Sequence, residues 1–99
     1  MQDIDICEYM GRRNERDLII DVRDKTLFML GTIQGAINIP LDNIGELYSL
    51  PKDRDIYVFC QQGEFSGEVV ELLTDAGYNA FNLTGGYRQY IRYVMSKKE

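Results

Sequence analysis

Two short and almost entirely apolar segments constrain the fold of this chain more than any other feature. They are LIIDV at residues 18–22 and IYVFC at residues 56–60. Because side chains alternate between the two faces of a strand, an apolar run indicates burial on both faces, as in parallel sheets covered by helices. The segment YNAFNL at residues 78–83 is predicted to form a third strand.

Helical patterns separate these strands. Asp3 is expected to cap the first helix, with no strand in front of it, and Ser66 is expected to cap the fourth, which ends before Gly77. Strands that alternate with helices predict an α/β fold with a central, mostly parallel sheet flanked by helices. The predicted helical segments lie at residues 3–10, 26–30, 42–50, 66–76 and 87–98.

The size and charge of the chain narrow the classes of function. Its 99 residues suit one domain, which we assign to residues 1–99, and the net charge of −5 argues against binding to nucleic acid or to anionic membranes. No apolar run is long enough to span a bilayer, and the first residues lack the pattern of a secretory signal. We therefore expect a cytoplasmic protein in which Cys7 and Cys60 are free thiols.

The chain contains no histidine. This excludes catalytic pairs of serine or cysteine with histidine, and it excludes metal sites built on histidine. Any chemistry that the chain performs alone must therefore proceed without an imidazole base. The TGG sequence at residues 84–86 is much weaker than a full dinucleotide-binding motif, and we expect no metal ion and no cofactor.

Cys60 stands where the second apolar strand meets a polar loop. Ligand sites of open parallel sheets lie beyond the carboxyl ends of the strands. A short loop that runs into a helix points several backbone N–H groups at a common centre, which favours a thiolate, a persulfide or a bound oxyanion there. Gly63 has the conformational freedom that such a loop needs. The alternative interpretation is that Cys60 is a packed core cysteine without chemical function.

Four segments occur in the order and spacing typical of one family. The chain resembles rhodanese-like domains from about Asp17 to Tyr90, and the resemblance implies a three-layer fold with a central, mostly parallel sheet. It also implies that Cys60 takes a sulfane sulfur from thiosulfate or a persulfide and passes it, as a persulfide, to a thiol, cyanide or protein acceptor. The segments are LIIDVRD (residues 18–24), GTIQGAINIP (31–40), IYVFCQQGEFS (56–66) and ELLTDAGYNAFNLTGGY (71–87).

The resemblance assigns the catalytic role to Cys60 and substrate binding to the loop that follows it. A related phosphatase branch of the family requires arginine at the end of a longer loop, where phosphate oxygens need a bidentate partner, and this chain has Ser66 at that position. Phosphatase activity is therefore disfavoured. The substrate-binding residues expected are Gln61, Gln62, Gly63, Glu64, Phe65, Ser66 and Arg23.

Two departures from the family pattern keep a second hypothesis open. No lysine or arginine lies between Cys60 and Ser66, whereas Glu64 adds a carboxylate, and Thr32 stands where the family usually has histidine. A non-basic loop is less suited to thiosulfate and leaves room for a persulfide donor. The second hypothesis is a catalytically weak rhodanese-like module that works through protein contacts or regulation, either alone or as part of a larger protein.

Five further residues receive expectations of their own. Asp21 is expected to tie down nearby backbone amides, and Arg23 either pairs with a carboxylate or lines the pocket rim. Gly85 and Gly86 follow the third strand and are expected to approach the Cys60 loop closely. Cys7 lies on the apolar side of its predicted helix, which favours core packing over a role as a second reactive thiol.

Overall fold

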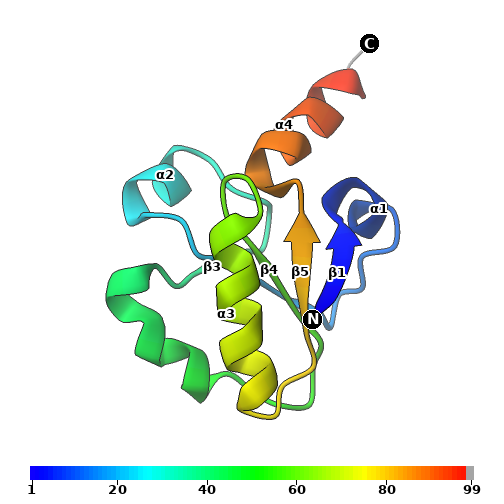
Figure 1. Cartoon of the computed structure of the whole chain (residues 1–99). Coiled ribbons are helices and arrows are strands. Elements are labelled where there is room, and N and C mark those ends of the chain that lie inside the picture. Colours follow the sequence, from blue (N-terminus) through cyan, green and yellow to red (C-terminus); the bar gives the residue numbers. More distant parts are fainter. Residues whose placement is uncertain (98–99) are drawn as a thin grey trace.

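The computed structural model describes residues 1–97, apart from the side chain of Glu64. Its centre is a five-stranded sheet in the order β1-β5-β4-β2-β3, and every neighbouring pair of strands is parallel (Figure 1). The strands are β1 (Gln2–Asp5), β2 (Leu18–Asp21), β3 (Ile37–Asn38), β4 (Ile56–Phe59) and β5 (Ala80–Thr84).

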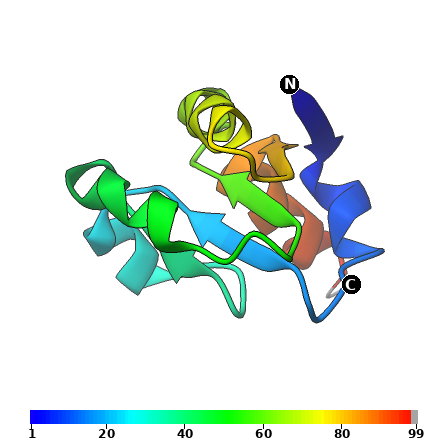
Figure 2. The same cartoon turned by 90° about the horizontal axis from the view of Figure 1, so that it is seen from below.

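Helices cover both faces of this sheet (Figures 1 and 2). On one face, α3 and η1 pack on β2 and β4 through a buried cluster that includes Leu47, Val58 and Leu73. On the other face, α1 and α4 enclose a second cluster that includes Ile6 and Phe59. The three-layer α/β fold expected from the sequence is therefore confirmed. The helices are α1 (Ile6–Met10), α2 (Lys25–Leu30), the 3₁₀ segment η1 (Leu41–Ser49), α3 (Glu64–Asp75) and α4 (Gly86–Ser96).

The central strand β4 shows why an unbroken apolar run was needed. All four of its side chains are buried. Ile56 and Val58 belong to the core beneath α3, whereas Tyr57 and Phe59 belong to the core beneath α1 and α4. Because both faces are covered, a polar residue at any of these positions would be removed from water on either side.

The expectation that no strand precedes the first helix is wrong. β1 pairs with β5 at one edge of the sheet, and only Ile4 of its four residues is buried. An edge strand that exposes most of its side chains has no apolar run, so the sequence pattern does not reveal it. The strand also moves the helix start, because Asp5 rather than Asp3 is the N-cap, and its carboxylate accepts hydrogen bonds from the amides of Cys7 and Glu8.

The carboxyl ends of the inner strands meet at one edge of the sheet, at the top of Figure 1. β2 ends at Asp21, β4 at Phe59 and β5 at Thr84. The segments that follow, which carry Arg23, Cys60 and the pair of glycines, are thereby brought together. Among residues 1–97, no helix is long and apolar enough to cross a lipid bilayer.

Candidate active site

The loop after β4 is shorter than the sequence suggested. Helix α3 begins at Glu64, so Ser66 lies inside its first turn and is not its N-cap. The N-cap is Gly63, whose φ of 103° lies in the left-handed region that favours glycine. This conformation turns the chain within three residues of Cys60 and aims the first turn of α3 back at the end of β4.

Three hydrogen-bonding groups of this turn lie within 3.4 Å of the sulfur of Cys60. The amide of Gly63 donates to Sγ at 3.0 Å and the amide of Ser66 at 3.4 Å. The hydroxyl oxygen of Ser66 lies 3.4 Å from the same sulfur. The expected convergence of loop N–H groups on Cys60 is therefore present in the structure.

These contacts favour a negative charge on the sulfur. Burial alone raises the pKa of the Cys60 thiol, but hydrogen bonds from the Ser66 hydroxyl and from the amides of Ser66, Gly63 and Gln62 outweigh it and lower the pKa below its ordinary value. The N-terminal end of α3 adds its positive dipole at the same place. The thiolate, which is the nucleophilic form of cysteine, is thus stabilised.

The beginning of α4 holds the Cys60 loop through backbone hydrogen bonds. The amides of Tyr87 and Arg88 donate to the carbonyl oxygens of Cys60 and Gln61 at 2.9 and 3.1 Å. Gly86, with a φ of 63°, lies so close that a β-carbon there would be 2.6 Å from each of these oxygens. The close approach expected for the glycine pair is therefore confirmed, and it fixes the backbone on which Cys60 sits.

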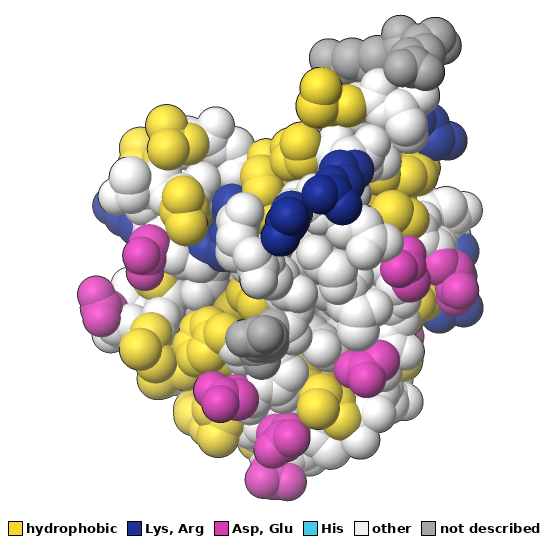
Figure 3. All heavy atoms as spheres, turned by 45° about the horizontal axis from the view of Figure 1, so that its top comes forward, with side chains coloured by type: hydrophobic (Ala, Val, Ile, Leu, Met, Phe, Trp, Pro, Cys, Tyr) yellow, Lys and Arg dark blue, Asp and Glu magenta, His cyan; other side chains and the backbone are white. Residues whose placement is uncertain are grey.

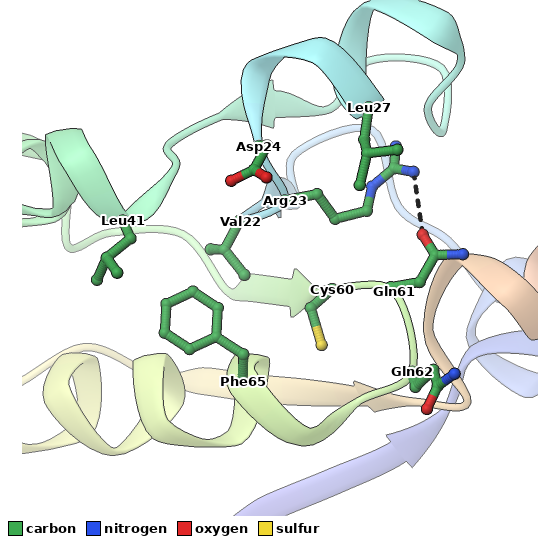
Figure 4. Close-up of a pocket in the computed structure, with 9 residues that line it drawn as sticks. All are labelled: Val22, Arg23, Asp24, Leu27, Leu41, Cys60, Gln61, Gln62 and Phe65. Atoms are coloured by element: carbon green, nitrogen blue, oxygen red, sulfur yellow. Dashed lines mark hydrogen bonds between the residues drawn. The ribbon is translucent and has the colours of Figure 1, made fainter.

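Cys60 forms part of the floor of an open pocket of about 500 Å³. Only 6% of the residue is exposed, and Figure 4 shows its sulfur between the ring of Phe65 and the side chain of Gln62. The pocket is more apolar than polar, because aliphatic and aromatic groups form one wall. Its lining residues are Val22, Arg23, Asp24, Leu27, Leu41, Cys60, Gln61, Gln62 and Phe65.

Arg23 lines the pocket but is committed to partners within the protein. Its guanidinium forms an ion pair with the fully buried Asp21 at 2.8 Å, donates to the carbonyl of Gly31, and lies 4.0 Å from the centre of the Tyr87 ring. Its Nη1 donates to Gln61 at 3.4 Å, the bond drawn in Figure 4. Asp21 also accepts from the backbone amide of Arg23, which confirms its expected structural role. The pair is electrically balanced and adds no net charge to the pocket.

The site residues predicted from the sequence fall into two groups in the structure. Gly63 and Ser66 contact the sulfur, while Gln61, Gln62, Phe65 and Arg23 line the pocket around it. Glu64 supplies the first residue of α3, and its side chain lies outside the described part of the chain. Cys7 packs at the edge of the opposite core, so the two thiols lie on different faces of the sheet.

Several residues near the site were missed by the sequence interpretation. Leu27 and Leu41 form the outer wall of the pocket although they are 40% and 62% exposed. The sequence singled out Thr32 only as a departure from the family pattern, whereas in the structure its hydroxyl donates a hydrogen bond to Asp21 at 2.8 Å. In Figure 3, where the carboxyl edge is turned toward the reader, hydrophobic side chains gather over α2 and η1 beside the pocket, whereas carboxylates spread over the lower part of the molecule. Leu27 lies in the helix predicted at residues 26–30 and Leu41 directly before the one predicted at 42–50, and nothing in the sequence marks either leucine as a pocket residue.

Comparisons with known proteins agree with this geometry. The sequence model of the Rhodanese-like domain matches residues 7–93. Thiosulfate sulfurtransferase PspE of Escherichia coli is 36% identical over 72 residues, which cover 70% of this chain and 69% of the relative. Adenylyltransferase and sulfurtransferase UBA4 of Meyerozyma guilliermondii is 34% identical over 94% of this chain, which spans about a quarter (24%) of that relative.

A solved structure shows the same arrangement of elements. The crystal structure of a rhodanese-like domain protein from Staphylococcus aureus superimposes with a TM-score of 0.81 at 33% sequence identity, and the match covers 89% of each chain. Because the family match extends over nearly the whole sequence and the fold agrees, this chain belongs to the rhodanese-like domain family.

Proposed function

We propose that the protein is a sulfurtransferase that carries a sulfane sulfur on Cys60 as a persulfide. The observation that supports this most strongly is the convergence of the Gly63 and Ser66 amides on Sγ. Such donors stabilise a thiolate before the reaction, and together with the dipole of α3 they favour the negative charge of a persulfide after it. The name of the Escherichia coli relative, a thiosulfate sulfurtransferase, agrees with this chemistry.

The first half-reaction loads the sulfur. The Cys60 thiolate attacks the outer sulfur of the donor, a new S–S bond forms, and the S–S bond of the donor breaks. The electron pair of the broken bond leaves with sulfite when the donor is thiosulfate, or with a thiolate when the donor is an organic persulfide. The chain has no histidine that could act as a base, and the lowered pKa of Cys60 favours the thiolate that attacks.

The second half-reaction unloads it. A nucleophilic acceptor, which is a thiolate, cyanide or a thiol of another protein, attacks the outer sulfur of the Cys60 persulfide. The S–S bond breaks, and its electron pair returns to Sγ, so that the thiolate is restored without an external oxidant or reductant. The acceptor leaves as a persulfide or, in the case of cyanide, as thiocyanate.

The charge of the pocket favours a persulfide donor over thiosulfate. Arg23 is neutralised by Asp21, and the remaining charged side chain among the described lining residues is Asp24. Thiosulfate carries two negative charges and meets no unpaired cation among the described lining residues, whereas Arg88 and Arg92 line a neighbouring pocket that shares Gln62. An organic persulfide carries one charge at most, and its carbon chain suits a wall formed by Leu27, Leu41 and Phe65.

A transfer assay tests the proposal. The protein is incubated with glutathione persulfide or thiosulfate as donor and cyanide as acceptor, and thiocyanate is measured above the rate without protein. We expect turnover that is abolished in Cys60→Ser and retained in Cys7→Ser. Turnover that persists in Cys60→Ser would overturn the mechanism. If no donor gives turnover, the protein acts as the binding module of the second hypothesis.

A further inference from the structure

Asn82 is a buried polar residue in the middle of β5 that the mechanism above does not use. It is 5% exposed, and its neighbours on the strand indicate which face it occupies. Ala80 belongs to the core beneath α3, and Leu83 belongs to the opposite core. Asn82 therefore points toward α3, into a region where a polar side chain is costly unless its hydrogen bonds are satisfied.

Both the oxygen and the nitrogen of the Asn82 side-chain amide form hydrogen bonds with the Cys60 loop. The hydroxyl of Ser66 donates to Oδ1 at 2.6 Å, and Nδ2 donates to the carbonyl oxygen of Gly63 at 3.3 Å. A carbonyl oxygen can only accept, so Nδ2 must face Gly63 and Oδ1 must face Ser66. This fixes the orientation of the amide and, with it, the direction in which the single hydroxyl proton of Ser66 points.

The two residues held by Asn82 are those that contact the sulfur. While Cys60 is a thiol, its S–H donates to the Ser66 oxygen, whose own proton is directed at Asn82. Asn82 donates to the Gly63 peptide, and the amide of that residue donates back to Sγ. The side chains of Cys60, Ser66 and Asn82 and the backbone of Gly63 form a closed ring of hydrogen bonds that includes the reactive sulfur.

We infer that Asn82 is a positioning residue that competes with the Cys60 thiolate for the hydroxyl proton of Ser66. When the thiol gives its proton to water, Sγ needs a donor, and the Ser66 hydroxyl supplies one only by turning away from Asn82. Ionisation of Cys60 therefore costs the short bond between Ser66 and Asn82. This inference rests on the proposed function in so far as Cys60 reacts as a thiolate.

Because of this competition, the Ser66 hydroxyl changes its hydrogen-bond acceptor when the negative charge moves between Sγ and the outer sulfur. In the ionised form without bound sulfur the charge is on Sγ, and the hydroxyl of Ser66 turns to it. In the persulfide the charge moves to the outer sulfur, Sγ becomes neutral, and the hydroxyl returns to Asn82. Asn82 thus provides an alternative acceptor at the moment when the inner sulfur stops needing a donor, without any change in the backbone of the loop.

Other charged groups near Cys60 stay in place in this scheme. The β2–α2 segment contributes Arg23, which is paired with Asp21, and Asp24, whereas η1 contributes only Leu41 to the pocket among the described residues. The side chain of Glu64 on α3 lies outside the described part. Arg88 and Arg92 of α4 line a neighbouring pocket with Gln62. None of these groups is altered by substitutions at positions 66 and 82, and comparing each Asn82 variant with and without the Ser66 hydroxyl isolates the contribution of its proton.

The experiment measures the pKa of Cys60 from the rate of alkylation by iodoacetamide against pH, followed by intact mass in a Cys7→Ser background. We expect Asn82→Leu to lower this pKa by roughly 0.5 to 1 unit, the worth of one hydrogen bond, because Ser66 is released to the thiolate. In a Ser66→Ala background the same substitution should give no downward shift. Asn79→Leu, at an exposed position just before the strand, is the control and should leave the pKa unchanged.

A second variant keeps the test decisive if Asn82→Leu does not fold. Asn82→Asp keeps the shape of the side chain and holds the hydroxyl proton of Ser66 more strongly. Its negative charge raises the pKa of Cys60 in both backgrounds, and the stronger hold on the proton should make the rise larger with Ser66 than in Ser66→Ala. Folding is checked by circular dichroism. A pKa unchanged by either substitution, or a shift in either variant that is equal with Ser66 and with Ser66→Ala, would overturn the inference. Alkylation needs no sulfur donor, so this result is independent of whether sulfur is transferred.

Discussion

Gly86 lies directly against the backbone of Cys60, and the contact leaves no room for a side chain. A β-carbon on Gly86 would lie 2.6 Å from the carbonyl oxygens of Cys60 and Gln61 and 2.7 Å from the carbonyl carbon of Gln61. Backbone atoms held by the first amides of α4 cannot move aside without displacing the loop. The start of α4 therefore determines where the reactive sulfur sits.

We expect Gly86→Ala to destabilise the protein by about 1–3 kcal/mol, because it adds a clash and places a side chain at a positive φ. It should also slow sulfur transfer by shifting the loop. Gly45→Ala is the matched control, since a β-carbon there meets no atom within 4 Å. Urea unfolding of both variants checks this, and equal stability of Gly86→Ala and the wild type would argue against the close contact.

The buried pair of Asp21 and Arg23 gives a second prediction. Asp21→Ala should cost about 3–5 kcal/mol, because it leaves the Arg23 guanidinium buried without its partner. Asp53→Ala removes the partner of Arg16 in a pair whose side chains are 75% and 65% exposed, and it should cost less than about 1 kcal/mol. Thermal and urea unfolding distinguish the two. Comparable losses would mean that the Asp21 pair is not buried in solution.

The pH dependence of Cys60 follows from its lowered pKa. Hydrogen bonds stabilise the thiolate, so the alkylation rate should reach half its maximum below the ordinary thiol value of about 8.5 and level off above it. Because the folded pKa lies below the unfolded one, the ionised thiol adds stability above the unfolded value, and this contribution is lost as the pH falls through the folded pKa. Cys7 serves as the internal comparison in the Cys60→Ser variant. A midpoint for Cys60 at or above about 8.5 would contradict the assignment.

Donor choice should respond to charge in the loop. The side chain of Gln62 lines the pocket, so Gln62→Arg adds a cation beside the sulfur and should raise kcat/KM for thiosulfate several-fold, with a smaller gain for glutathione persulfide. Gln34→Arg changes the net charge equally but lies outside the pocket. Rates with both donors, at low and high salt, separate the two effects. A similar gain in both variants would show that global charge rather than the pocket governs donor binding.

Much of the fold was predictable because its inner strands are apolar on both faces. β2 and β4 carry that pattern in the sequence, and their order with the helices indicates parallel connections. β1 was not predictable, because an edge strand with one buried side chain resembles a loop. The start of α3 was misplaced because Ser66 is a good N-cap by type, whereas the left-handed Gly63 lets the helix begin earlier.

The contacts of the candidate site likewise divide into those that the sequence predicted and those that it did not. The contacts of Cys60 with Gly63 and Ser66 are local in sequence, and the loop pattern together with the family resemblance predicted them. Asn82 reaches Ser66 from another strand, 16 residues away, and nothing local distinguishes it from the exposed Asn79. The single domain, the cytoplasmic location and the absence of a cofactor stay predictions from the sequence.

The most direct measurement of the central claim is the mass of the intact protein after incubation with glutathione persulfide or thiosulfate and removal of the donor. Loading of sulfur on Cys60 should add about 32 Da, cyanide should remove it, and Cys60→Ser should not acquire it while Cys7→Ser does. An unchanged mass with both donors, or the same gain in Cys60→Ser, would contradict the proposal that Cys60 carries the transferred sulfur.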